Sequence, residues 1–251
     1  MSNIRLAWLS ALIGFLAGIF GALVGVGGGV VVVPLLTGWL GLAQHMSHGT
    51  SLISVGFTGI VGAYTYYQGG SLDLELALTV GIPAGICAVL GARATGRLEV
   101  GQLRRVFGIL LLVVAASLLL EEFFAPDLSW LGQARWPLLV VGGAFSGYAS
   151  GLLGIGGGTI LVPLLVFVAG LDQHLAQGTS LLAMVFPSAV GGMVHSRMGQ
   201  VNWRVLPYLL FGSFIGAYLG GMAALVAPAQ LLRGIFALVL SWTGVGYLRR
   251  G

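Results

Sequence analysis

Charge is scarce in this sequence, and lysine is absent from it. Only 7% of the 251 residues are charged, whereas soluble domains carry roughly 25%. All eleven basic residues are arginines, and seven residues are acidic. Hydrophobic residues make up 57% of the chain, so a soluble fold would have too few polar side chains to cover its surface. The composition excludes an ordinary soluble domain and indicates that lipid is the solvent.

Only one cysteine is present, and no acidic residue lies in the middle of an apolar segment. With Cys87 alone, the chain cannot form an intrachain disulfide or a cysteine metal cluster. The acidic residues all lie near the ends of apolar segments: Asp73, Glu75, Glu99, Glu121, Glu122, Asp127 and Asp172. A carboxylate proton relay within the membrane is therefore not expected. A cation would find no buried counter-charge, whereas an anion has no need of one.

Long apolar runs fill nearly the whole chain. A membrane crossing takes about 20 apolar residues, so there is room for eight to ten membrane segments and for no separate soluble domain. The N-terminal run has no A-x-A-like cleavage site before its glycines, so we interpret it as a first span rather than a signal peptide. The predicted segments are residues 5–24, 28–41, 49–68, 74–92, 101–120, 136–153, 157–170, 178–196, 203–225 and 230–248.

The two halves of the chain repeat each other at an offset of 129 residues. Residues 25–52 and 154–181 align without a gap, and sixteen of these twenty-eight positions are identical. Further on, Leu103 and Arg104 return as Leu232 and Arg233. We therefore predict an all-α polytopic membrane protein with two homologous repeats, residues 1–125 and 130–251, that form one integrated membrane domain.

The second segment of each half is short. Its roughly 14 residues would span about 21 Å, less than the roughly 30 Å hydrocarbon core, so we expect half-helices or re-entrant elements. If the N-terminus is cytoplasmic and every segment crosses the membrane, most arginines lie on the cytoplasmic side, with Arg135 and Arg233 as exceptions. Five side-changes per half make the repeats inverted, as in many secondary transporters. True re-entrant segments would make them parallel; the charge pattern favours inversion.

A glycine cluster precedes each short segment. The clusters contain Gly27, Gly28 and Gly29 in the first half and Gly156, Gly157 and Gly158 in the second. Glycine costs about 1 kcal/mol relative to alanine within a helix, so we expect a helix break that exposes backbone N–H groups. A helix that starts after such a break suits an anion, because its N–H donors and positive dipole end point outward. Close helix packing is the alternative interpretation.

A polar motif follows each short segment. It consists of Gln44, His45, Thr50 and Ser51 in the first half and of Gln173, His174, Thr179 and Ser180 in the second. The hydroxyl residues are either helix N-caps or ligands of a substrate. The histidines are either loop residues at the membrane interface or groups that tune anion affinity with pH, since an imidazole changes charge between about pH 5 and 8. His48 is replaced by Gln177 in the repeat, so any proton handling would be asymmetric.

The pattern G-x-G-G-G-x-x-x-x-P-L-L, followed by Q-H-x-x-x-G-T-S-L, occurs in both halves and resembles the TauE/SafE family of sulfite exporters, also called TSUP permeases. The resemblance covers essentially the whole chain. It implies transport of sulfite, sulfoacetate or a related organosulfonate across a bacterial or archaeal inner membrane. The thiosulfate-transporting branch of that family uses conserved cysteines, whereas here Cys87 stands alone and aligns with Gly216. This departure favours sulfite or an organosulfonate.

These observations predict a secondary transporter that binds a small anion between the two glycine-rich breaks and works by alternating access, with proton linkage as an option. The candidate substrate-binding residues are the six glycines of the two clusters and the eight residues of the two polar motifs. A membrane channel and a partner-binding membrane subunit are the alternatives. An enzyme is not expected, because no nucleophile with its base, metal set or carboxylate pair is recognisable. We expect lipid contacts but no cofactor, metal or nucleic acid, and leave a homo-oligomer open.

Overall fold

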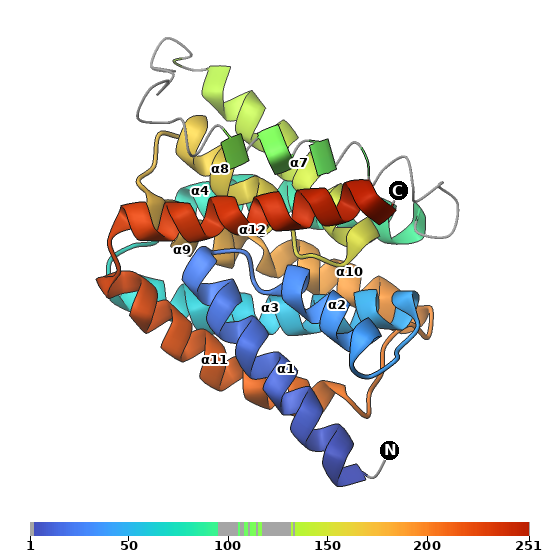
Figure 1. Ribbon diagram of the computed structural model, residues 1–251. Coiled ribbons are helices and arrows are strands. Elements are labelled where there is room, and N and C mark those ends of the chain that lie inside the picture. The colour runs from blue at the N-terminus through green and yellow to red at the C-terminus, as the bar shows by residue number, and fades with distance from the viewer. Residues whose placement is uncertain are drawn as a thin grey trace.

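The computed structural model describes residues 3–94 and 134–250, together with residues 105, 108, 109, 111–113, 115, 116 and 132. Every regular element in this part of the chain is a helix (Figure 1). The helices are α1 (Asn3–Val24), α2 (Gly29–Gly38), α3 (Gln44–Gln68), α4 (Leu74–Ala94), α7 (Arg135–Leu153), α8 (Gly158–Phe167), α9 (Gln173–Ala183), α10 (Val185–Arg197), α11 (Leu206–Val226) and α12 (Ala229–Arg250). The predicted all-α class is confirmed for these residues.

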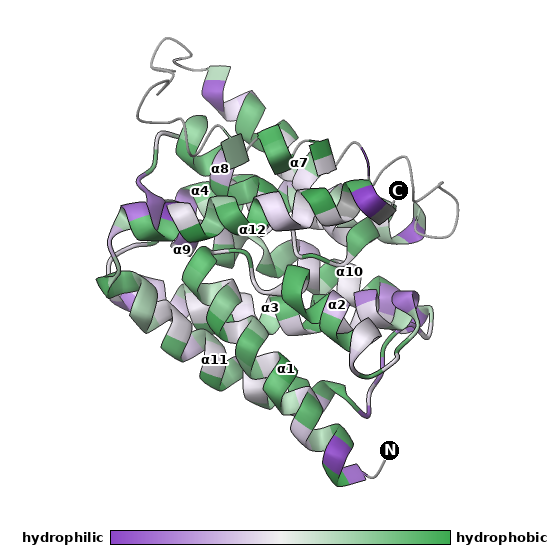
Figure 2. Ribbon diagram, in the orientation of Figure 1, coloured by the Kyte–Doolittle hydropathy of each residue, from purple (hydrophilic) through white to green (hydrophobic). Residues whose placement is uncertain are grey.

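Six stretches are long and apolar enough to cross a membrane. They comprise α1, α4, α7, the α9–α10 pair, α11 and most of α12. Hydrophobic residues run along the helices, while hydrophilic ones gather mainly at helix ends (Figure 2). The short helices α2 and α8 contain 10 residues each, fewer than predicted. The predicted segment 101–120 lies largely outside the described residues, so the total of eight to ten segments stays a prediction.

Small residues bring the long helices together in two matching pairs. A Cβ at Gly18 of α1 would lie 2.7 Å from the Ser213 carbonyl oxygen of α11. At the repeat-related positions, a Cβ at Gly147 of α7 would overlap the Ala84 carbonyl oxygen of α4. A larger residue at these positions would keep the helices apart. Close backbone packing matters in a membrane, because lipid tails provide no hydrophobic driving force for helix association. The same packing therefore occurs at the same 129-residue offset.

The third segments begin earlier than predicted, which corrects one interpretation of the hydroxyl residues. Thr50 and Ser51 lie in the second turn of α3, so they are not N-caps. The N-cap of α9 is Asp172, whose Oδ1 accepts a hydrogen bond of 3.0 Å from the Leu175 amide. Gly49 lies inside α3, where a side chain would overlap the Gln200 backbone, so close packing accounts for a glycine at this helical position despite its low helix propensity.

The bundle has two chemically different ends. At the first, the Asn202 amide donates to Thr50 Oγ1, so the start of α3 lies beside the α10–α11 connection and Arg204. We call this the arginine end; Arg197 and Arg249 also lie there. At the opposite, acidic end, the Asp73 amide donates to Thr179 Oγ1. Asp172 and Glu75 lie at that end, together with the two exceptions, Arg135 and Arg233.

Candidate functional site

Two glycine loops interrupt the bundle where the sequence predicts helix breaks. Residues 25–28 separate α1 from α2, and residues 154–157 separate α7 from α8. Gly28 and Gly157 are the N-caps of the short helices, with φ values of 81° and 82°. A side chain in this left-handed region costs roughly 1–2 kcal/mol, and only glycine adopts it routinely. Three of the four residues in each loop have a positive φ, so the loops have the same backbone shape.

The two loops touch each other through their backbones. A Cβ at Gly29 would lie 2.8 Å from the Ile155 Cα, and a Cβ at Gly158 would lie 2.7 Å from the Val26 Cα. Val26 and Ile155 are buried in the core. Val55, halfway along α3, packs against Gly27 of the first loop. The glycines thus allow two helix starts to meet inside the bundle.

Side-chain hydroxyls hold the loops in place. Ser180 Oγ donates a 3.0 Å hydrogen bond to the Gly25 carbonyl oxygen, and Ser146 Oγ donates one of 2.9 Å to the Gly157 carbonyl oxygen. Thr50 and Thr179 each accept a hydrogen bond from a backbone amide of the connection after a neighbouring helix. These three predicted site hydroxyls therefore position backbone in this conformation.

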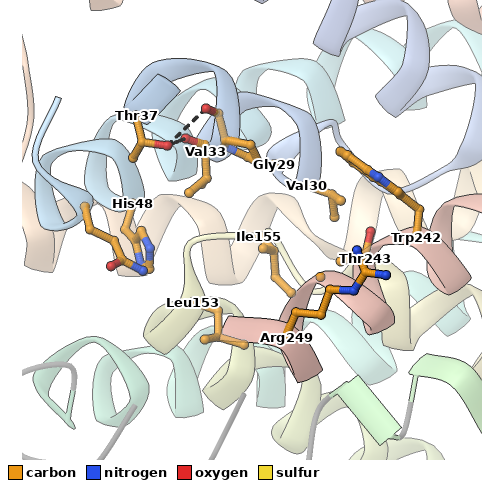
Figure 3. A pocket seen from close by; sticks show the side chains of 13 residues that line it. Gly29, Val30, Val33, Thr37, His48, Leu153, Ile155, Trp242, Thr243 and Arg249 are labelled. Atoms are coloured by element: carbon orange, nitrogen blue, oxygen red, sulfur yellow. Dashed lines mark hydrogen bonds between the residues drawn. The ribbon is translucent and has the colours of Figure 1, made fainter. Parts of the chain in front are cut away.

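A cavity of about 480 Å³ reaches the start of α2 from the arginine end. Gly29 forms its inner wall together with Ile155 of the second loop, and Gln44 and His48 of α3 line one side. Figure 3 shows Trp242, Thr243 and Arg249 of α12 on the opposite side of the cavity from His48. The cavity thus brings together a glycine loop, one polar motif and the last helix.

The charges around this cavity favour an anion. Arg249 is the charged residue among the described residues that line it, and no carboxylate is found among them. A guanidinium binds oxyanions through two parallel N–H groups, and the start of α2 contributes N–H donors with a positive dipole end. The Gln44 side-chain amide is exposed and can donate as well. A small anion would therefore meet donors from three separate elements.

The structure separates the other predicted site residues from this cavity. His45 is exposed at the start of α3. His174 Nε2 lies 3.2 Å from the Ala224 carbonyl oxygen and 3.1 Å from that of Ala227, so this imidazole caps the end of α11. Gln173 is fully buried, and Ser51 Oγ has no hydrogen-bond partner among the described residues. Only Gly29 and Gln44 of the predicted set line the cavity.

Sequence reasoning missed the contribution of α12. Trp242 and Arg249 both line the cavity, yet an arginine near a segment end is typical of a topology anchor. One signal was present in the sequence. Trp242 lies inside its predicted segment, whereas the other tryptophans lie near segment ends, as an aromatic belt requires. Among the described residues, no group of histidine, cysteine or carboxylate side chains could hold a metal ion.

Comparison with known proteins gives matches along nearly the entire chain. The sequence model of the family described as "Sulfite exporter TauE/SafE" matches residues 10–247. Two relatives come from Bacillus subtilis (strain 168): the probable membrane transporter protein YdhB, 29% identical over 94% of this chain and 98% of its own length, and the probable membrane transporter protein YunE, 27% identical over 95% and 96%. A probable membrane transporter protein of Haemophilus influenzae is 29% identical over 92% of each chain. No solved structure matches.

Proposed function

Since the chain belongs to the sulfite exporter TauE/SafE family, we propose that it is a secondary transporter of a small sulfur-containing anion, such as sulfite, sulfoacetate or another organosulfonate. Its relatives are named as membrane transporters, and its six apolar spans make it a multi-pass membrane protein. We place it in the cell inner membrane, with the arginine end in the cytoplasm because positive side chains stay on that side.

The observation that carries the proposal is the cavity at the start of α2. Its described lining includes Arg249, Gln44 and His48 but no carboxylate. A volume of about 480 Å³ is ample for a three- or four-oxygen sulfur anion with some of its water. In this proposal the anion enters from the arginine end and binds between Arg249, the Gln44 amide and the first N–H groups of α2.

The glycine loops provide the pivot of the proposed mechanism. The N-caps Gly28 and Gly157 begin the two short helices, which meet through Gly29 and Gly158 inside the bundle, where an anion could be passed from one helix start to the other. Equivalent contacts at the 129-residue offset, Gly18 with Ser213 and Gly147 with Ala84, each join a helix of one repeat to a helix of the other, which supports a symmetric arrangement of two bodies that rock around this centre. The opposite charge of the two ends supports inverted repeats.

The test is uptake into proteoliposomes of radiolabelled sulfite, sulfate and sulfoacetate, each with and without an imposed pH gradient. Saturable flux that prefers one sulfur anion supports the proposal, and a response to the gradient establishes proton linkage. Absence of flux for all three, from protein that elutes as a folded monodisperse species, contradicts the proposed substrate class. A conductance that does not saturate would indicate a channel instead.

A further inference from the structure

Four residues of the first half that line the open cavity have counterparts in the second half. Gly29, Val30, Gln44 and His48 correspond at the 129-residue offset to Gly158, Thr159, Gln173 and Gln177. Matching contacts place the two sets alike. A Cβ at Gly154 would lie 2.8 Å from the His48 Cα, and a Cβ at Gly25 would lie 2.8 Å from the Gln177 Cα. The second set therefore surrounds the start of α8 as the first set surrounds the start of α2.

The second set is closed, and four of its side-chain polar atoms lack partners within the described residues. Thr159, Gln173 and Gln177 have no exposed surface. Within the described residues, Thr159 Oγ1, both amide atoms of Gln173 and Gln177 Nε2 form no hydrogen bond. Tyr66 donates a 3.0 Å hydrogen bond to Gln177 Oε1, so only the N–H donors of this side-chain amide are unpaired among the described residues. Buried polar groups are nearly always paired, so these four atoms need a partner that this conformation does not supply.

The closed set lies towards the acidic end of the bundle. Gln173 follows the N-cap Asp172 at the acidic end, and its neighbour His174 contacts the last carbonyls of α11. The open set lies at the arginine end. Helix α8 has 10 residues, and its N-cap Gly157 leaves the first N–H groups beside Thr159 without a side-chain cap. Donors from a helix start, a hydroxyl and two side-chain amides are the groups that bind an oxyanion without a countercharge.

We propose that Thr159, Gln173 and Gln177 form a second anion subsite at the start of α8, which is closed here and opens to the acidic end in the alternative conformation. This inference rests on the proposed transport function and adds a second binding position to the transport pathway. The repeat aligns Arg249 with Leu120, so the counterpart of the charged residue is apolar. Thr159, Gln173 and Gln177 are neutral donors, whereas Arg249 adds a positive charge at the first site, so we expect the anion to leave the second subsite more readily than the first.

Thiol accessibility tests the subsite directly. In a Cys87→Ala background with native flux, the single variants Gln44→Cys and Gln173→Cys are reconstituted and treated with a membrane-impermeant maleimide from one side at a time. We expect Gln44→Cys to react only from the arginine end and Gln173→Cys only from the acidic end. Saturating sulfoacetate should slow both reactions at least fivefold. Reaction of Gln173→Cys from neither side or from the arginine end overturns the subsite, and so does a lack of protection by sulfoacetate when the native chain transports this anion.

Flux measurements separate this inference from the proposed function. Thr159→Val installs the residue type that Val30 provides in the first half, and it removes an unpartnered hydroxyl, so the protein should fold as well as the native chain. We expect its sulfoacetate flux to fall at least fivefold, with Thr159→Ser restoring most of it. Native flux in Thr159→Val overturns the subsite while transport stands. Absent flux in the native chain, with reaction of Gln173→Cys from the acidic end, contradicts the substrate class instead.

Discussion

The two glycine loops have the same backbone but different hydrogen-bond partners. Gly28 packs against the Ala17 carbonyl, whereas Gly157 packs beside Ser146, whose hydroxyl bonds the Gly157 carbonyl oxygen. The first loop is instead tied across the bundle by Ser180. Backbone geometry is thus what both halves share, and side-chain contacts are where they differ. We expect the shared backbone geometry of the loops to serve anion passage. We expect the differing side-chain contacts to determine which end of the bundle is open.

The shared backbone leads to the prediction with the largest effect. Gly28→Ala and Gly157→Ala each place a Cβ at a φ near 80° and against neighbouring atoms. We expect either variant to lose more than about nine-tenths of sulfur-anion flux, because strain of roughly 1–3 kcal/mol adds to steric overlap at the helix start. Flux in proteoliposomes at matched protein content measures this.

A repeat-related pair of glycines provides the control. Gly41 and Gly170 have φ values of 66° and 73°, and a Cβ at either would meet no atom within 4 Å. Gly41→Ala and Gly170→Ala therefore introduce the same backbone strain without the overlap, and we expect most of the flux to remain. Equal losses in all four variants would show that general backbone strain, and not the steric overlap at the start of the short helices, accounts for the effect.

The charge at the open cavity leads to a smaller effect. Arg249→Gln keeps a hydrogen-bond donor but removes the positive charge that lines the open cavity and that the aligned residue of the first repeat, Leu120, lacks. We expect the half-saturating anion concentration to rise about tenfold, equivalent to about 1.4 kcal/mol, with a smaller change in maximal flux. Concentration series of uptake measure both quantities.

Arg204→Gln is the matched control, because Arg204 is exposed at the same end but does not line the cavity. It should leave the half-saturating concentration within about twofold of the native value. If both variants weaken the anion equally, the effect is a general surface potential at the arginine end, and Arg249 is no specific ligand.

The sequence predicted the elements better than their arrangement. Helix breaks at Gly28 and Gly157 follow from glycine propensity, and the end positions of Asp73 and Asp172 follow from the cost of a buried charge. These are local effects. The cavity between Arg249 and Gln44 joins residues more than 200 positions apart, and no spacing rule connects them.

The repeat also conceals the difference between the halves. Identical glutamines at positions 44 and 173 predict equal roles, yet Gln44 is exposed and Gln173 is buried. Exposure of each glutamine depends on the packing of the whole bundle, which the identity of the two repeated residues does not specify. The N-cap interpretation of Thr50 was wrong because the predicted segment began at Gly49, whereas α3 begins at Gln44 and includes Gly49, which packs against the Gln200 backbone.

The hydroxyl that ties the first loop leads to the smallest predicted effect. Ser180 Oγ donates a hydrogen bond to the Gly25 carbonyl oxygen across the bundle. The aligned residue of the first repeat, Ser51, forms no side-chain hydrogen bond among the described residues. Ser180→Ala leaves a buried carbonyl without this bond, so we expect a loss of about 1 kcal/mol in the free energy of unfolding and a lower midpoint of thermal unfolding in detergent. Ser51→Ala removes a hydroxyl that already lacks a bond, and its midpoint should stay at or slightly above the native value. A larger loss in Ser51→Ala than in Ser180→Ala would mean that the bonds of the two loops exchange, and that the opposite conformation dominates in detergent.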